Sequence, residues 1–219
     1  MFECGSLLDL SHTIASSLFE KVEYPWEVLP LIKDFIIEAG SKLPLDEYEV
    51  RDGNIWIHKT AVVFPSAYIK GPCIICPETE VRHCAFIRGN ALIGANCVIG
   101  NSTELKNVII FDNVQVPHYN YVGDSVLGFK SHLGAGSITS NVKSDKTLTV
   151  VKYEGGQIET GLKKFGAIVG DHTEVGCGTV LNPGSVVGKN CRIYPLSAFR
   201  GYLPPNSIYK KQGEIAEIK

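Results

Sequence analysis

Aliphatic residues recur at every sixth position along most of the chain, and a small residue follows four positions after many of them. The aliphatic series comprises Ile57, Val63, Ile69, Ile75, Val81, Ile87, Ile93, Ile99, Leu105, Val169, Val175, Leu181, Val187 and Ile193. The small series comprises Ala61, Ala67, Cys73, Thr79, Ala85, Ala91, Cys97, Thr103, Thr173, Thr179, Ser185, Cys191 and Ser197. One large and one small inward position in each step predict a triangular coil of three short strands joined by tight corners. Stacked coils would bury the aliphatic residues in ladders and pair as parallel strands about 4.8 Å apart.

This pattern resembles the hexapeptide repeat of left-handed parallel β-helices. We therefore expect an all-β solenoid over residues 51–219. Its left hand is implied by the resemblance alone, because crossovers between parallel strands are otherwise almost always right-handed. Gly and Asn in steps such as IGANCV, VGCGTV and LNPGSV suit the corners, where a positive φ is needed.

Residues 1–50 have a helical spacing instead. The segments SHTIASSLFEK and YPWEVLPLIKDFIIEAG each predict a helix, with Ser11 as an N-cap, Pro25 in a first turn and Gly40 as a stop. Pro30 is expected to kink the second helix. We expect this segment to cap the open end of the solenoid or to contact another subunit, since an exposed ladder edge invites aggregation.

The six-residue pattern slips near Ile110 and Leu127 and stops between about residues 142 and 163. The sequence VKSDKTLTVVKYEGGQIETGL is too polar and irregular for a coil, so we expect a loop ejected from the solenoid. Its lysines Lys143, Lys146 and Lys152 form either a solvated loop surface or a contact for an anionic ligand.

The composition predicts a globular protein with one main domain, since 44% of its 219 residues are hydrophobic. A formal net charge of −2 provides no polycationic surface, so neither nucleic acid nor an anionic membrane is an expected partner. The N-terminal sequence has no basic, apolar leader, and no stretch approaches the roughly 18 apolar residues of a membrane span. These features predict a cytoplasmic protein.

Seven cysteines, an odd number, are more typical of reduced thiols than of a disulfide framework. Cys73 and Cys76 form a CxxC, a spacing that also occurs in zinc and redox sites. Cys73, Cys97 and Cys191 occupy the small position of the repeat, however. We therefore expect buried small side chains and no bound metal.

Five segments between Phe86 and Asp171 depart from the plain repeat: IRGN, TELKN, VPHYNYVGD, LGAGSITSN and LKKFGAIVGD. Together they closely resemble the acetyltransferase domain of the bifunctional GlmU enzymes. The resemblance implies a homotrimer, with sites at subunit interfaces, that transfers an acetyl group from acetyl-CoA to the amine of glucosamine-1-phosphate or a similar sugar. The N-terminal segment is too short for the nucleotidyltransferase domain of those enzymes and lacks a glycine-rich nucleotide loop, so uridylylation is not expected.

The same resemblance implies roles for individual residues. His118 matches the general base that takes a proton from the sugar amine. The implied substrate-binding residues are Arg88, Lys106, Tyr121, His132, Asn141 and Lys164, of which His132 replaces a family asparagine. The implied acetyl-CoA residues are Ala135, beside the acetyl group, Cys177, in place of a smaller residue, and Arg200, as a substitute for a basic C-terminal arm.

These residue types suit the implied chemistry. An amine attacks a thioester only when neutral, and histidine is the side chain that accepts a proton near neutral pH. Two separated cations, Arg88 and Lys106, suit a phosphate monoester. Backbone N–H groups of the GAG turn would meet a developing oxyanion.

Two other classes of protein share parts of this pattern. A zinc-dependent carbonic anhydrase-like solenoid needs three histidines on neighbouring coils, for which the candidates are His83, His118, His132 and His172. Arg88 and Lys106 would repel a metal ion there, which disfavours that hypothesis. The second alternative is a non-catalytic protein that binds a sugar phosphate or nucleotide sugar and has lost the acyl-CoA half of the site. An assay with acetyl-CoA separates it from an enzyme.

Overall fold

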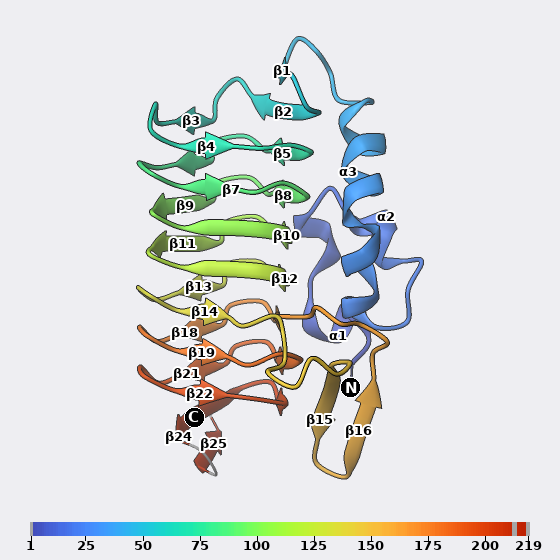
Figure 1. Cartoon of the computed structure of the whole chain (residues 1–219), viewed down its shortest axis with the longest axis vertical. Coiled ribbons are helices and arrows are strands. Elements are labelled where there is room, and N and C mark those ends of the chain that lie inside the picture. Colours follow the sequence, from blue (N-terminus) through green and yellow to red (C-terminus); the bar gives the residue numbers. More distant parts are fainter. Residues whose placement is uncertain (1, 212–213, 218–219) are drawn as a thin grey trace.

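The computed structural model, which describes residues 2–211 and 214–217, is a triangular β-solenoid with short helices along one side (Figure 1). As the chain descends in Figure 1, the near strands run from left to right and the far strands from right to left, which is a left-handed winding. Strands of successive coils pair in parallel. The predicted class of fold is therefore confirmed.

Each coil adds one strand to each of three faces, in the order first, second, third. The strands of the first face are β3 (Val62–Val63), β6 (Glu80–Val81), β9 (Val98–Asn101), β11 (Gln115–His118), β13 (His132–Leu133), β18 (Glu174–Val175), β21 (Arg192–Ile193), β24 (Ser207–Lys211) and β25 (Glu214–Glu217). The second face comprises β4 (Tyr68–Ile69), β7 (Phe86–Ile87), the first parts of β10 (Glu104–Ile110) and β12 (Tyr121–Leu127), β14 (Ile138–Thr139), β19 (Val180–Leu181) and β22 (Ala198–Phe199). The third face comprises β1 (Tyr48–Arg51), β2 (Ile55–His58), β5 (Cys73–Ile75), β8 (Ala91–Ile93), the last parts of β10 and β12, β17 (Ala167–Val169), β20 (Ser185–Val187) and β23 (Tyr202–Leu203).

The core consists of the aliphatic ladders that the repeat predicts. Ile57 pairs with Ile75 and Ile75 with Ile93, a step of 18 residues or three hexads. The next steps, from Ile93 to Ile110 and from Ile110 to Leu127, are 17 residues each. The slips in the pattern are therefore coils shortened by one residue, and these aliphatic side chains remain buried.

The small position of the repeat is also mostly buried. Cys73, Cys97 and Cys191 are buried as predicted, and so is Cys76. Burial raises the pKa of these thiols, that of Cys76 to about 12. At neutral pH the Cys73 and Cys76 sulfurs are therefore protonated, a form that is a poor nucleophile and a poor metal ligand.

The N-terminal helices lie along the third face (Figure 1). They are α1 (Cys4–Leu7), the 3₁₀ helix η1 (Leu10–His12), α2 (Ser16–Phe19), the 3₁₀ helix η2 (Pro25–Leu31) and α3 (Ile32–Gly40). Helix α3 contacts β5, β8 and β10, and η2 contacts β12. The strand at the N-terminal end of the solenoid is β1, which pairs antiparallel with β2. Whether the segment also contacts another subunit stays a prediction.

Local features of these helices agree only in part with the sequence prediction. Pro25 starts η2, and the chain changes from 3₁₀ to α geometry just after Pro30, as expected of a break there. Ser11 is not an N-cap: it lies inside η1, and its backbone N–H donates to the Asp9 carboxylate. Gly40 ends α3, and a Cβ there would lie 2.4 Å from the Trp56 ring, so close packing requires glycine.

The ejected segment contains regular structure that the sequence did not predict. Its middle forms an antiparallel hairpin of β15 (Val150–Tyr153) and β16 (Gly156–Glu159). The hairpin packs against the last coils, since a Cβ on Gly184 would lie 2.6 Å from the Val150 carbonyl oxygen and Val151 is fully buried. The expectation of an irregular loop was therefore wrong, because packing against the coils stabilises the hairpin. Among the described residues, no helix is both long and apolar enough to cross a bilayer.

Candidate functional site

The second face presents the predicted phosphate-binding residues on neighbouring coils. Its strands place one inward residue between two outward ones, and Ile87 and Leu105 are the inward residues of β7 and β10. Arg88 and Lys106 follow them at equivalent positions, because Leu105 pairs with Ile87. The two cations are thus one coil apart, a spacing of about 4.8 Å along the solenoid.

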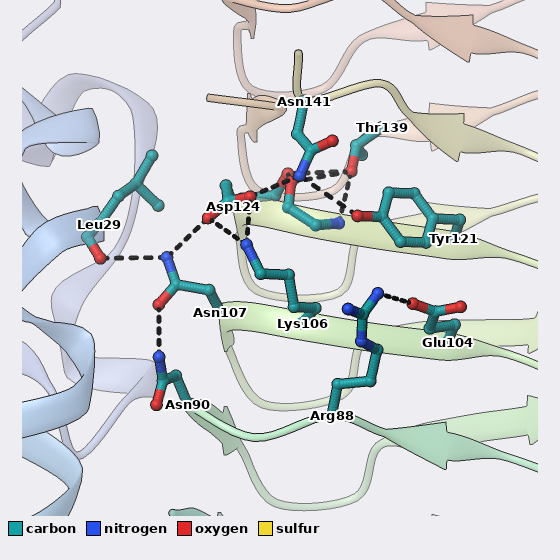
Figure 2. Close-up of polar contacts among 12 residues, drawn as sticks. Leu29, Arg88, Asn90, Glu104, Lys106, Asn107, Tyr121, Asp124, Thr139 and Asn141 are labelled. Atoms are coloured by element: carbon teal, nitrogen blue, oxygen red, sulfur yellow. Dashed lines mark hydrogen bonds and ion pairs between the residues drawn. The ribbon is translucent and has the colours of Figure 1, made fainter. Parts of the chain in front are cut away.

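Each of these cations already faces a carboxylate (Figure 2). Arg88 Nη1 lies 2.7 Å from Glu104 Oε1, in a pair whose side chains are 46% and 31% exposed. Lys106 Nζ lies 2.9 Å from Asp124 Oδ2, and the Asp124 side chain is only 6% exposed. An incoming anion can displace the Glu104 carboxylate at small cost, since exposed ion pairs contribute about 1 kcal/mol or less. Lys106 is held much more firmly.

Asp124 is the functional candidate that sequence reasoning missed. It follows Gly123 at the corner between the second and third faces, and it accepts from the Asn107, Asn141 and Lys106 side chains. Its φ of 47° lies in the left-handed region, which Asp tolerates better than most residues. The GD of the quoted VPHYNYVGD segment was the available signal, because an acid at a corner between buried strands must find partners.

Tyr121 and Asn141 adjoin this network. The Asn141 Nδ2 group donates to the Tyr121 hydroxyl at 3.2 Å and also to Asp124. Burial raises the pKa of the Tyr121 phenol, and the Asp124 carboxylate raises it further. The phenol therefore stays protonated at neutral pH and can donate a hydrogen bond. Lys164 is exposed next to Phe165, whose backbone N–H donates to the Asn141 carbonyl oxygen.

His118 lies on the opposite edge of the second face. It ends β11 at the corner between the first and second faces, and its side chain is exposed. Its backbone N–H donates to the Asn120 Oδ1 atom at 3.0 Å, and buried Asn120 in turn donates to the Gly134 and Ser137 carbonyl oxygens. Within residues 2–211 and 214–217, the His118 imidazole has no hydrogen-bond or ion-pair partner. The corner is fixed, but the single chain does not bring this imidazole to the phosphate cations.

The predicted acetyl-CoA residues are divided between two corners. Ala135 and Cys177 continue the His118 corner on successive coils, because the Gly136 N–H donates to the His118 carbonyl oxygen and the Gly178 N–H to that of Ala135. Arg200 lies on the other corner. The prediction of an oxyanion site in the GAG turn is wrong for two of its three N–H groups, since those of both glycines bind carbonyl oxygens of adjacent coils.

His132 does not join the second face. It lies on β13 of the first face, where its Nδ1 atom is 2.7 Å from Glu174 Oε2. Sequence matching located the position, but only the winding of the coil showed which face it occupies. In the single chain, His132 is therefore separate from the other predicted substrate residues. The described part of the chain contains no group of three or more His, Cys, Asp or Glu placed to hold a metal ion.

Arg200 lines three adjoining cavities at the C-terminal end of the second face. One, of about 380 Å³, also contains Lys152, Tyr153 and Tyr202 in its wall. Another, of about 440 Å³, continues past Asn182. The third, of about 190 Å³, lies between the ejected hairpin and the coils, lined by Lys143, Asp145, Val150, Lys152, Pro183 and Arg200. The hairpin thus brings two of its lysines to Arg200, a contact that the sequence did not predict.

Comparison with known proteins places the chain beside sugar-phosphate enzymes. Residues 69–151 match the family described as the GMPPB C-terminal domain. The chain is 34% identical over 200 residues to "Bifunctional protein GlmU" of Methanococcus maripaludis, covering 90% of this chain and 48% of that protein. It is 29% identical over 174 residues to "Bifunctional sugar-1-phosphate nucleotidylyltransferase/acetyltransferase" of Sulfurisphaera tokodaii, covering 78% of this chain and 43% of that one. The resemblance to GlmU is confirmed, and the chain spans about half the length of these curated relatives.

Among solved structures, a hexapeptide transferase family protein from Anaplasma phagocytophilum overlaps 75% of this chain and 79% of its own. The TM-score is 0.43 and the identity 14%. The overlap is partial at that score, and the strand pairing described above carries the assignment of the fold.

Proposed function

We propose that this chain, which resembles the GlmU proteins over nine-tenths of its length, is an acyltransferase that moves an acetyl group from acetyl-CoA to the amine of a phosphorylated amino sugar. The observation that carries the proposal is the second face. Arg88, Lys106, Tyr121 and Asn141 lie there on successive coils, and His118 stands at its edge. A sugar phosphate needs such a set of cations and hydrogen-bonding groups at one end and a proton acceptor at the other.

In the proposed reaction, His118 takes a proton from the sugar ammonium group as the amine attacks the thioester carbonyl carbon. The C–S bond then breaks, and coenzyme A leaves as the thiol after receiving a proton. Arg88 and Lys106 bind the phosphate, and the protonated Tyr121 hydroxyl donates to a sugar oxygen. The exposed His118 side chain is accessible to such a substrate.

We propose that a second copy of the chain completes this site, in a homotrimer. His118 and Lys106 lie on opposite edges of the second face, and the imidazole has no orienting partner within the described chain. A neighbouring subunit would supply that partner. Light scattering should report about three times the chain mass of 23.9 kDa. A monomer at micromolar concentration would contradict a shared site.

The cavities around Arg200 are the proposed place for the phosphates of acetyl-CoA. Asn182 and Arg200 continue the corner of Arg88 and Lys106, and Arg200 is four coils from Lys106, or about 19 Å along the solenoid. One phosphate cannot bridge that distance, so this cleft would hold a different phosphate from the sugar's.

Arg200→Ala should therefore raise the KM for acetyl-CoA about tenfold and leave the KM for the sugar phosphate unchanged, because hydrogen bonds to charged groups contribute about 1.5–3 kcal/mol. Steady-state kinetics with each substrate varied in turn measure both constants. The control is Lys146→Ala, an exposed lysine of the ejected segment that does not line the 190 Å³ cavity. Equal kinetics of the two variants would exclude the cleft from donor binding.

The experiment that tests the function is a panel of amino-sugar phosphates, each mixed with acetyl-CoA and followed by the release of free thiol. We expect sugar-dependent thiol release and an N-acetylated product by mass spectrometry. If the sugar phosphates bind but no thiol is released under any condition, the non-catalytic alternative holds and the transferase proposal is wrong.

A further inference from the structure

The Asp124 carboxylate is the buried centre of a polar network that joins three coils to the N-terminal segment (Figure 2). Its oxygens lie 2.9 and 3.1 Å from Lys106 Nζ and accept from the side-chain amides of Asn107 and Asn141. Asp124 as a whole is 4% exposed. A buried carboxylate is tolerated only when donors replace its water, and here three side chains do so.

The network reaches two of the proposed substrate residues. Lys106 ends a flexible four-carbon chain, which in isolation would sample many rotamers. Ion pairing to Asp124 restricts that sampling, and the Lys106 side chain remains 24% exposed toward solvent. Asn141 is bound from one side by Asp124 and contacts the Tyr121 hydroxyl on the other. Asp124 thus orients both groups without facing solvent itself.

The same network is anchored outside the solenoid. Asn107 Nδ2 donates to Asp124 Oδ1 at 3.0 Å and to the Leu29 carbonyl oxygen of η2 at 3.1 Å. Asn90 supports Asn107 from the coil above, through a 3.3 Å hydrogen bond. The N-terminal helical segment therefore braces the corner from which Lys106 projects.

We propose that Asp124 is a positioning residue for the substrate site, which holds Lys106 and Asn141 in the geometry that receives the sugar phosphate. This inference rests on the proposed function for its substrate. It assigns Asp124 no contact with the substrate, because its oxygens are turned toward the three donors. It also gives the N-terminal segment a role in binding, through Leu29 and Asn107.

The test is Asp124→Asn, which preserves shape but presents an amide to three donors. We expect the KM for the amino-sugar phosphate to rise about tenfold while kcat changes little, because a substrate contact is weakened rather than the chemistry. Brief labelling with an acetylating N-hydroxysuccinimide ester, read by peptide mass spectrometry, should modify Lys106 several times faster than in the wild type. That second readout needs no enzyme activity.

The matched control is Asp171→Asn. Asp171 is 2% exposed and likewise pairs with a lysine one coil away, Lys189, at 3.1 Å. It also accepts from a backbone N–H of the N-terminal segment, that of Asp9. It lies on the far corner, between the third and first faces. Asp171→Asn should lower the thermal midpoint comparably and speed the labelling of Lys189, but leave the KM for the sugar phosphate unchanged.

A double-mutant cycle decides whether Asp124 acts through Lys106. In a Lys106→Gln background, Asp124→Asn should raise KM much less than in the wild type. Full additivity, or an equal rise in KM for Asp171→Asn, would overturn the proposal. If Asp124→Asn fails to fold, Asn107→Ala serves instead, since it removes one donor to Asp124, and an unchanged KM and labelling rate would then count against the network. Should the wild type acetylate no amino sugar, the proposed function fails while the labelling still tests the positioning.

Discussion

His118→Ala is expected to lower kcat for acetyl transfer by about 10²- to 10⁴-fold, the range typical of a lost general base. The variant should still bind the sugar phosphate, because Arg88, Lys106 and Tyr121 lie beyond the opposite side of the corner and remain in place. The fold should persist, since the exposed imidazole packs in no ladder and Asn120 holds the corner through backbone groups. Rapid-quench or thiol-release assays at saturating substrate measure the loss.

The control for this variant is His83→Ala. His83 occupies the same corner two coils earlier, because Asn101 pairs with His118 and Val81 with Ile99. It is exposed in the same way, so its removal tests the effect of deleting a corner histidine as such. Full activity of His118→Ala, or unfolding of that variant alone, would make His118 a structural residue.

Arg88→Ala is expected to raise the KM for the sugar phosphate about 10- to 100-fold with a smaller change in kcat, since the lost charge-assisted hydrogen bond contributes about 1.5–3 kcal/mol. That split applies if the guanidinium contacts the phosphate equally in the ground and transition states. Stability should change little, because the Arg88–Glu104 pair is substantially exposed. Steady-state kinetics with the sugar varied and acetyl-CoA saturating separate the two constants.

Arg82→Ala is the matched control, because Arg82 forms an equivalent pair with Glu80 at 2.9 Å on the first face. Its removal should leave both constants unchanged. A normal KM for Arg88→Ala would show that the phosphate binds elsewhere, and the cleft at Arg200 would become the first alternative.

The repeat was sufficient to predict the solenoid because its information is local. Every hexad buries one aliphatic and one small residue, so the same packing recurs from Ile57 to Ile193 whatever lies elsewhere in the chain. Even the slips at Ile110 and Leu127 are absorbed by coils of 17 residues. Motif matching located Arg88, Lys106, Tyr121 and Asn141 for a related reason, since residues 17 or 18 apart become neighbours once the period is known.

Features that depend on contacts between distant segments were not readable in this way. The hairpin of β15 and β16 forms because Val151 is buried against the last coils, and the N-terminal helices lie along the third face because their apolar side chains are buried there. His132 was matched to the substrate site, yet the winding of the coil puts it on the first face, beside Glu174.

The sequence by itself determined the coil, its ladders and the residues that project from the second face, because a strict period of six allows one way to bury the aliphatic side chains. The tertiary structure alone decided how those residues are held. Asp124 becomes the centre of the site only when the corner places its carboxylate against Lys106 and Asn141, from the coils before and after, and against Asn107, which Leu29 anchors. Buried carboxylates take the partners that folding brings to them, and no spacing along the chain specifies those partners.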